Sequence, residues 1–238
     1  WMSFRRETRC GRRKNSYIRN TKERTMDGLK TLTILLSEYD KLMIPNFQRD
    51  YKWGDREEFI TEFFDSIYKD YQAFKHTKTN EASIKRKYIG DMILWENGGV
   101  ANIVDGQQRT ITISALIMYL EFNKVIMGVT CSSDGVGSGI ISTRKVGTQS
   151  VQTCRLEYQD KIYLSRFDSI FQDNDGLKDQ FIKLRQSVKE FIDGKELKMR
   201  GEGKTDEEIL IDFQSFHSYL SREIEFYCKI CQTRDEAI

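Results

Sequence analysis

A short apolar run, an Asp-Gly bend and a long apolar helix pattern follow one another directly between residues 101 and 122. Residues 101–104 favour a strand, Asp105 and Gly106 favour a tight turn, and residues 107–122 are apolar on most faces of a helix. A helix that is apolar on most faces must be buried. We therefore expect a layered fold in which this helix starts at the edge of a sheet and is covered by other elements.

The start of this helix has the chemistry of an anion-binding site. The first helical N–H groups lack partners within the helix, and the peptide dipoles add partial positive charge there. Arg109 would add a permanent charge in the first turn, and the amides of Gln107 and Gln108 can orient a water molecule or a base. Spacing alone favours a simpler interpretation, in which Asp105 caps the helix, Gly106 eases the turn and the first turn is solvated.

A second polar segment favours an anion-binding site over this simpler interpretation. Residues 44–53 contain the only proline of the chain, Pro45, together with a Gln-Arg pair and three aromatic residues. Because proline fixes its own backbone and keeps the preceding residue extended, we expect a rigid connector rather than a helix. Such a connector would hold Gln48 and Arg49 in one place.

Three stretches occur in order along the chain: Ile-Pro-Asn-Phe-Gln-Arg-Asp-Tyr-Lys-Trp at 44–53, Tyr-Ile-Gly-Asp at 88–91 and Val-Asp-Gly-Gln-Gln-Arg-Thr at 104–110. In order and separation they resemble the N-terminal domain of GmrS and GmrSD-type modification-dependent (type IV) restriction enzymes, a family related to the ParB/sulfiredoxin-like fold. The resemblance covers residues 26–238. It implies an α+β fold, with a small mixed sheet packed with helices and additional helices toward the C-terminus.

The resemblance also implies a function in restriction or phage defence. It implies binding and hydrolysis of a nucleoside triphosphate, with Mg²⁺, coupled to recognition or cleavage of modified phage DNA, and a nuclease domain or subunit as partner. The residues that it implies for hydrolysis are Asp105, Gln107, Gln108 and Arg109. The residues that it implies for nucleotide binding are Gln48, Arg49, Gly106 and Thr110.

Each of these groups would have a defined role if the resemblance holds. Arg109 would offset charge developing on the transferred phosphoryl group, and Gln107 or Gln108 would orient the attacking water. Asp105 has two candidate roles, as a ligand of a divalent metal beside the phosphates or as a cap that fixes Arg109. We favour the cap, because one carboxylate is a poor magnesium site unless phosphates supply other ligands.

The chain departs from the family pattern in two ways. Members usually continue into Phe-x-x-x-Asn-x-Arg-Gly-x-x-Leu, whereas this sequence ends at residues 235–238, so we expect a domain truncated at its C-terminal end. If the absent Asn and Arg complete the nucleotide pocket, this chain would bind weakly or not turn over. The associated nuclease resembles an HNH type with histidines and a metal, but His76 and His217 are far apart, so we expect no DNA cleavage by this chain alone.

Two other classes of function are open from the sequence. One is a DNA-sensing or partner-binding module without turnover, in which Arg49, Arg109 and the aromatic rings of Phe47, Tyr51 and Trp53 contact phosphates and bases. The other is a purely structural subunit, which predicts that neither nucleotide nor DNA protects the protein against thermal unfolding.

The net charge of +2 hides a basic N-terminal segment. Residues 1–24 hold nine basic residues against two acidic ones, a local charge of +7, which leaves −5 for residues 25–238. We expect residues 1–25 to be a tail, disordered or foreign to the domain, and residues 26–238 to be the domain itself. A basic tail could add sequence-independent affinity for phosphates or have no function. The glycine- and serine-rich residues 128–139 are expected to form a flexible loop.

The length of the apolar runs and the number of cysteines predict where in the cell the protein is located. No run of eighteen apolar residues occurs, so we expect no membrane span. The five cysteines are scattered and odd in number, which favours a reducing, cytoplasmic location. Cys228 and Cys231 have the spacing of zinc ligands, but no second Cys or His pair matches them. We interpret both as strand residues and predict no metal site made by the protein alone.

Elsewhere the apolar pattern predicts alternating helices and strands. The predicted helices are residues 29–36, a helix with a core-facing stripe over 59–71, residues 177–192, and residues 206–220 opened by a capping box at 205–208. The predicted strands are residues 41–47, 87–95, 100–104 and 223–231, with a hairpin turn at 97–99. The charged residues 195–204 are predicted to be a mobile loop.

Overall fold

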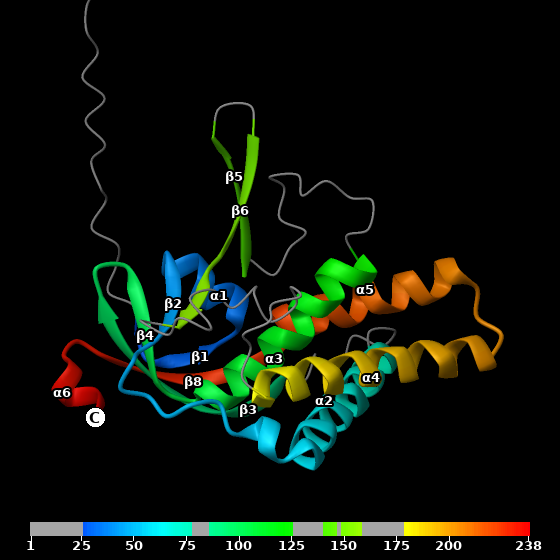
Figure 1. The fold of residues 1–238 in the computed structure, drawn as a ribbon, viewed down its shortest axis with the longest axis horizontal. Helices are drawn as coiled ribbons and strands as arrows, with labels where there is room; N and C mark the ends of the chain where they lie inside the picture. The colour runs from blue at the N-terminus through cyan, green and yellow to red at the C-terminus, as the bar shows by residue number, and fades with distance from the viewer. Residues whose placement is uncertain (1–25, 78–85, 126–139, 147–148, 159–178) are drawn as a thin grey trace, which may run out of the picture.

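The computed structural model describes residues 26–77, 86–125, 140–146, 149–158 and 179–238 (Figure 1). The expected tail at residues 1–25 and the expected loop at residues 128–139 lie outside the described residues. Within the part that is described, no helix is both long enough and apolar enough to cross a membrane.

Six strands form one mixed sheet, which confirms the predicted α+β class. From one edge to the other, the strands are β1 (Gly28–Lys30), β8 (Ile224–Cys231), β3 (Lys87–Asn97), β4 (Val100–Asp105), β2 (Lys41–Ile44) and β7 (Leu156–Tyr158). β1 with β8 and β3 with β4 are antiparallel, whereas β8 with β3, β4 with β2, and β2 with β7 are parallel. Since parallel neighbours need long crossover connections, most of the helices lie between strands in the chain.

Within the described residues, six α-helices accompany the sheet: α1 (Leu32–Glu38), α2 (Glu57–Thr77), α3 (Gln107–Leu120), α4 (Asp179–Gly201), α5 (Asp206–Arg222) and α6 (Arg234–Ala237). Two shorter helical segments, η1 (Trp53–Asp55) and η2 (Glu121–Val125), precede α2 and follow α3. α3 contacts α4 and α5, and α2 packs against the same two helices (Figure 1). The predicted burial of α3 is confirmed, since twelve of its fourteen residues are buried.

Aromatic rings join the helices to one another. The ring of Phe64 in α2 contacts that of Phe191 in α4, with the ring centroids 5.1 Å apart. The ring of Tyr71 in α2 contacts that of Phe216 in α5, with the ring centroids 4.9 Å apart. Phe64, Tyr71 and Phe216 are buried in the core. Full burial of a ring of this size contributes about 2–3 kcal/mol. The apolar stripe predicted over residues 59–71 is therefore packing between helices.

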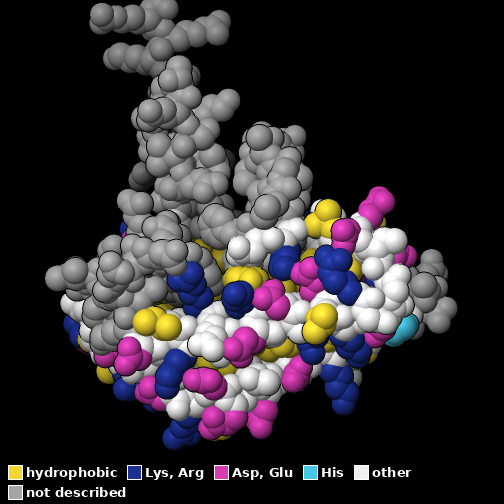
Figure 2. Space-filling model, turned by 45° about the vertical axis from the view of Figure 1, so that its right-hand side comes forward, with side chains coloured by type: hydrophobic (Ala, Val, Ile, Leu, Met, Phe, Trp, Pro, Cys, Tyr) yellow, Lys and Arg dark blue, Asp and Glu magenta, His cyan; other side chains and the backbone are white. Residues whose placement is uncertain are grey.

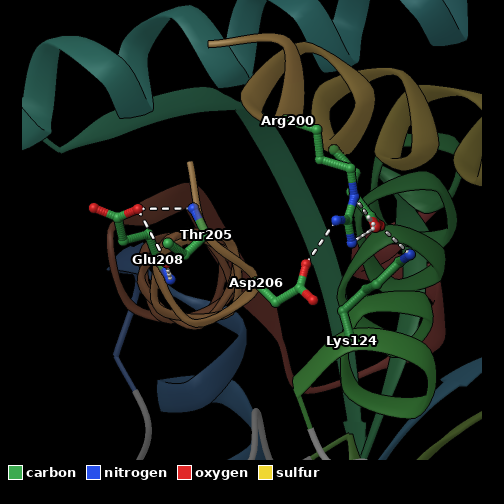
Figure 3. Close-up of polar contacts among 6 residues, drawn as sticks. Lys124, Arg200, Thr205, Asp206 and Glu208 are labelled. Atoms are coloured by element: carbon green, nitrogen blue, oxygen red, sulfur yellow. Dashed lines mark hydrogen bonds and ion pairs between the residues drawn. The ribbon is translucent and has the colours of Figure 1, made fainter. Parts of the chain in front are cut away.

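Two local predictions are confirmed. The capping box opens α5: the Thr205 hydroxyl accepts from the backbone N–H of Glu208 at 3.3 Å, and the Glu208 carboxylate accepts from the backbone N–H of Thr205 at 2.8 Å (Figure 3). The hairpin turn between β3 and β4 contains Gly98 and Gly99, with φ of 58° and 84°. Both angles lie in the left-handed region, which glycine adopts at the lowest cost.

The first helix starts later than predicted. Leu29 lies in β1, opposite Tyr227 of β8. The N-cap of α1 is Thr31, whose hydroxyl accepts a hydrogen bond from the backbone N–H of Ile34 at 3.2 Å. The prediction of a helix over residues 29–36 was wrong at its start, because pairing with a strand near the other end of the chain overrides the local pattern.

α4 continues through the segment predicted to be a mobile loop. It ends at Gly201, so the prediction for residues 195–204 was wrong over most of its length. The ammonium of Lys195 lies 2.9 Å from a carboxylate oxygen of Asp65 on α2 and 4.7 Å from the ring centroid of Phe191. These contacts hold a charged segment in a helix, although the sequence pattern reveals only its charge.

Ion pairs connect the end of α4 to its neighbours (Figure 3). Arg200 lies 2.9 Å from Glu196 on its own helix and 2.6 Å from Asp206 at the start of α5. Lys124 of η2 reaches Glu196 at 2.5 Å. The hydrogen bond from Lys124 is the main reason why the pKa of Glu196 lies below its usual value.

A separate two-stranded ribbon is formed by β5 (Ile141–Val146) and β6 (Gln149–Cys154). It extends away from the six-stranded sheet and from the helices (Figure 1). The apolar pattern predicts neither of these strands, because most of their residues are polar.

Candidate functional site

α3 begins where β4 ends, as the sequence pattern predicts. The N-cap is Gly106, with φ of 88° and ψ of 0°, so the expected capping role of Asp105 was wrong. A carboxylate oxygen of Asp105 instead accepts from the backbone N–H of Gly106 at 2.7 Å. A Cβ at Gly106 would lie 3.1 Å from the carbonyl oxygen of Asp91, so both the turn angle and this close approach favour glycine. The buried hydroxyl of Thr110 donates to the Gly106 carbonyl at 3.0 Å.

The two glutamines of the first turn hold the connector between β2 and η1. Gln107 Nε2 donates to the carbonyl oxygen of Arg49 at 3.0 Å. Gln108 Nε2 donates to the carbonyl oxygen of Asp50 at 3.2 Å, and Gln108 Oε1 accepts from the backbone N–H groups of Lys52 and Trp53 at 2.7 and 3.2 Å. Both side chains are buried, so these bonds satisfy polar backbone that would otherwise be left unpaired.

One polar atom of this network has an unsatisfied hydrogen-bonding capacity. Gln107 Oε1 is buried and accepts no hydrogen bond from any described residue. Its orientation is fixed, because only the NH₂ group of the amide can donate to the carbonyl oxygen of Arg49. A buried acceptor without a donor costs about 1–3 kcal/mol, so this oxygen is a place where a water or a ligand hydrogen would bind favourably.

Further contacts fix the connector from its own side. Gln48 Nε2 donates to the carbonyl oxygen of Val104 at 2.7 Å, directly before the bend into α3. The hydroxyl of Tyr51 is 2.8 Å from that of Thr112, and its ring stacks on Phe181 with a centroid distance of 5.2 Å. The rigidity expected for this segment therefore rests on side-chain contacts as well as on its proline.

The aromatic residues of the connector differ in their access to solvent. Tyr51 is 1% exposed, so its expected contact with bases was wrong, and burial raises its pKa. Trp53 is half-buried and packs edge-on against Phe63 at 5.4 Å. Phe47 is 37% exposed, with the guanidinium of Arg234 4.4 Å from its ring centroid. Of these three residues, Phe47 is the most exposed.

Arg109 connects the second motif, residues 88–91, to the helix start. Its Nη1 and Nη2 donate to the carbonyl oxygens of Ile89 and Asp91 at 2.9 and 3.1 Å. Gly90, between these two residues, has φ of 119°, and a Cβ there would lie 1.5 Å from Nη1 of Arg109. The sequence indicated this motif without assigning it a role. In the structure, its backbone carbonyls bind the guanidinium of Arg109, and its glycine leaves the space that this group fills.

Two exposed carboxylates belong to residues beside the helix start. Asp105 directly precedes the N-cap Gly106. The carbonyl oxygen of Asp91 accepts from Arg109 and lies next to Gly106. The hydroxyl of Tyr88 donates to the Asp91 carboxylate, which raises the pKa of Tyr88.

Neither arginine at the helix start forms an ion pair with a described residue. Arg109 donates to neutral carbonyls, and the exposed side chain of Arg49 has no ion pair with any described residue. Two guanidinium groups therefore add to the partial positive charge of the α3 N-terminus. All eight residues expected at the site lie on the connector or in the first turn around Gly106, so the fold brings them together.

The histidines and cysteines lie apart from this network. His217 of α5 is buried, and its Nε2 is 2.9 Å from a carboxylate oxygen of Glu121 in η2. Cys228 and Cys231 are buried free thiols in β8, as expected for strand residues. Among the residues that the structure describes, no cluster of His, Cys, Asp and Glu could hold a metal ion by itself.

Comparison with known proteins identifies the family of the chain. The family model described as GmrSD restriction endonuclease, N-terminal domain, matches residues 32–237, a range that contains all three motifs. A comparison with curated proteins finds no match. The resemblance inferred from the motifs is confirmed, and the chain belongs to the family of the N-terminal domain of the GmrSD restriction endonuclease, a domain of restriction and phage-defence proteins.

Proposed function

We propose that the start of α3 and the connector bind and hydrolyse a nucleoside triphosphate, within a restriction system that acts on modified foreign DNA. The observation that carries this proposal is the pair of guanidinium groups, Arg49 and Arg109, at the N-terminus of a buried helix, neither of which forms an ion pair with a described residue. Arginine binds phosphate oxygens through a planar fork of donors, and a helix N-terminus adds backbone N–H groups. A triphosphate is the ligand class that matches this set.

The hydrogen bonds of the polar residues support a different division of the proposed roles. Gln107 Oε1, which lacks a donor, would accept a hydrogen from the attacking water and so orient it. Gln108 uses both atoms of its amide on the backbone of Asp50, Lys52 and Trp53, so its role would be to hold the connector in place. Arg109 would offset negative charge on the phosphoryl group while the water oxygen bonds to the terminal phosphorus and the bond to the bridging oxygen breaks. The nucleoside diphosphate leaves, and the proton of the water passes to the released inorganic phosphate.

Magnesium fits this site only with help from the ligand. The exposed carboxylates of Asp91 and Asp105 belong to residues beside the helix start, and they would hold the ion together with phosphate oxygens. Bound there, Mg²⁺ would neutralise phosphate charge. Gly106 and Thr110 would act through the backbone, by keeping the bend close to the ligand.

A panel of ligands tests the proposal. We expect nucleoside triphosphates with Mg²⁺ to raise the melting temperature, diphosphates to raise it less, and nucleosides without phosphate to leave it unchanged. Release of inorganic phosphate from each triphosphate measures turnover in the same samples. Equal melting temperatures with all ligands, and no phosphate release, would contradict the proposal.

A DNA-sensing module without turnover is the second candidate. The exposed ring of Phe47, covered on one side by Arg234, favours it, because stacked aromatic and guanidinium groups also bind bases. Duplex binding in the absence of any phosphate release, and without any effect of nucleotide on the melting temperature, would support this candidate over the first. In either case a nuclease domain or subunit would cut the DNA.

A further inference from the structure

Tyr88 is an exposed aromatic residue beside the proposed nucleotide site, and the roles described above do not use its ring. It opens the Tyr-Ile-Gly-Asp motif in β3 and is 51% exposed. The backbone of the same motif binds the guanidinium of Arg109. One short segment therefore holds the proposed phosphate-binding arginine and presents an aromatic ring to solvent.

Hydrogen bonds connect Tyr88 to Arg109 through the motif. The carbonyl oxygen of Ile89, the next residue, accepts from Nη1 of Arg109 at 2.9 Å. The hydroxyl of Tyr88 donates to the carboxylate of Asp91, whose carbonyl oxygen accepts from Nη2 of Arg109 at 3.1 Å. The bond to Asp91 is the main reason why the pKa of Tyr88 is raised, and the positive charge of Arg109 acts in the opposite direction. The phenol and the guanidinium thus lie close to one another.

An irregularity in β3 makes the contact between Tyr88 and Asp91 possible. Residues three apart in a regular strand point to opposite faces of the sheet. The register of β3 with β8 shifts between Tyr88 and Asp91, and Gly90 between them has φ of 119°. Such a bulge bends a strand and changes the direction of its side chains. The backbone therefore holds the Tyr88 ring in one orientation by way of its hydroxyl.

Other exposed aromatic rings are less suited to receive a base at this place. Phe47 of the connector already contacts the guanidinium of Arg234, 4.4 Å from its ring centroid. Tyr227 of β8 is exposed and opposite Asp91 in the register, but it forms no hydrogen bond with a described residue of the motif. The ring of Tyr88 contacts no aromatic or cationic group among the described residues, so it is open to a ligand.

Overall charge gives this domain little attraction for a triphosphate. Residues 25–238 sum to −5, and Figure 2 shows basic and acidic side chains interspersed over one face of the molecule. A mixed surface with net negative charge does not concentrate anions around it. Affinity for a nucleotide must therefore come from local groups, and an uncharged contact with the base adds to it without repulsion.

We infer that the base of the nucleoside triphosphate stacks on the ring of Tyr88, and that the site consequently takes purine nucleotides in preference to pyrimidine nucleotides. Aromatic rings bind the faces of bases, and a ring already held in position loses little freedom on binding. A purine covers more of the ring than a pyrimidine does. The inference rests on the proposed function, since the triphosphate bound at Arg109 is what brings the base to Tyr88.

The test compares a base-bearing ligand with one that has only phosphates. Isothermal titration calorimetry with Mg²⁺ measures binding of inorganic tripolyphosphate and of the β,γ-methylene analogues of ATP, GTP, CTP and UTP. For Tyr88→Ala we expect affinity for the purine analogues to fall at least about fivefold, the lower end of the range for stacking of a base on an aromatic ring. Affinity for tripolyphosphate should stay within about twofold, which also shows that the variant is folded.

Two further variants separate the ring from other effects of the substitution. Tyr88→Phe keeps the ring and loses the hydrogen bond to Asp91, so it should retain affinity for the purine analogues within about threefold. The matched control is Phe59→Ala, which removes an exposed ring of α2 and should leave all affinities within about twofold. In the wild type and the control, purine analogues should bind at least about threefold more tightly than pyrimidine analogues, and Tyr88→Ala should lose this preference.

The outcomes distinguish this inference from the proposed function. If Tyr88→Ala binds every analogue as tightly as the wild type, the inference is overturned and the proposed phosphate site stands. An equal loss of affinity for tripolyphosphate and for the analogues would also overturn it, because Tyr88 would then act through Asp91 and Arg109 rather than on the base. If the wild type binds neither tripolyphosphate nor any analogue, the inference and the proposed nucleotide site both fail.

Discussion

The guanidinium of Arg109 occupies the space that a side chain at position 90 would need, since a Cβ on Gly90 would lie 1.5 Å from its Nη1. The two residues come from separate motifs, and the contact gives a physical reason for a glycine in the Tyr-Ile-Gly-Asp stretch. The carbonyls on either side of Gly90 accept hydrogen bonds from Arg109, so β3 and the first turn of α3 are connected at this point.

Substitution of this glycine should destabilise the protein and displace the arginine. For Gly90→Ala we expect a loss of about 2–4 kcal/mol in the free energy of unfolding, from steric overlap and from a φ of 119° that alanine rarely adopts. Urea denaturation measures this loss. In an Arg109→Ala background the overlap is relieved, so the second substitution should cost less than it does alone. Strictly additive losses would show that the two side chains do not compete for space.

Gln108 should contribute to stability rather than act only in chemistry. Gln108→Ala removes hydrogen bonds to the carbonyl of Asp50 and to the N–H groups of Lys52 and Trp53, and we expect it to lower the free energy of unfolding by about 2–4 kcal/mol. Gln108→Glu keeps the acceptor for both N–H groups but loses the donor, so its loss should be smaller if the carboxylate is tolerated. Chemical denaturation of the three proteins is the measurement. An Ala variant as stable as the wild type would contradict the network described here.

The ion pairs at Glu196 predict how stability depends on pH. Its pKa is lowered in the folded state, mainly by the hydrogen bond from Lys124, so its contribution is present above the unfolded pKa near 4.5 and is lost as pH falls through the lower folded value. The stability difference between wild type and Glu196→Gln should therefore be larger at pH 7 than at pH 3. Glu62→Gln, an exposed carboxylate of α2, serves as control and should show no such change. A constant difference for Glu196→Gln would contradict the prediction.

The Cys228 thiol should be unreactive in the native protein. Burial raises its pKa to about 12, so at pH 8 only about one molecule in 10⁴ would carry the thiolate, and the side chain is 0% exposed. Alkylation with iodoacetamide, followed by mass spectrometry of the peptide that contains Cys228, measures the rate. The same peptide in urea should react at the rate of a free thiol, and a similar rate in the folded state would contradict the prediction.

Local patterns predicted the elements that are specified by the residues of the element itself. α3 is apolar on most of its faces, and the β3–β4 hairpin contains two adjacent glycines, so both were expected and both are found. The short edge strand β1 was not expected, because its three residues are specified by pairing with β8. The last turns of α4 were also missed, since Lys195 and Arg200 are ordered by ion pairs with other elements.

The site was predictable as a set of residues but not as a set of contacts. The order of the motifs predicted that the connector and the first turn of α3 belong to one site, and the fold places the two segments in contact. Sequence could not indicate that Gln108 is fully used by backbone groups, or that Gly106 replaces Asp105 as the cap. Those assignments depend on three-dimensional distances between segments that are far apart in the chain.

Arg49 gives the most direct test of the proposed nucleotide site. Its side chain is exposed and makes no ion pair with a described residue, while its backbone is held by Gln107, so Arg49→Ala should leave the melting temperature of the free protein unchanged. The measurement is the rise in melting temperature with a nucleoside triphosphate and Mg²⁺ for wild type, Arg49→Ala and the exposed control Arg222→Ala. We predict that Arg49→Ala loses most of this rise and that the control retains it. An equal rise in all three proteins would contradict the proposal that phosphates bind between the connector and α3.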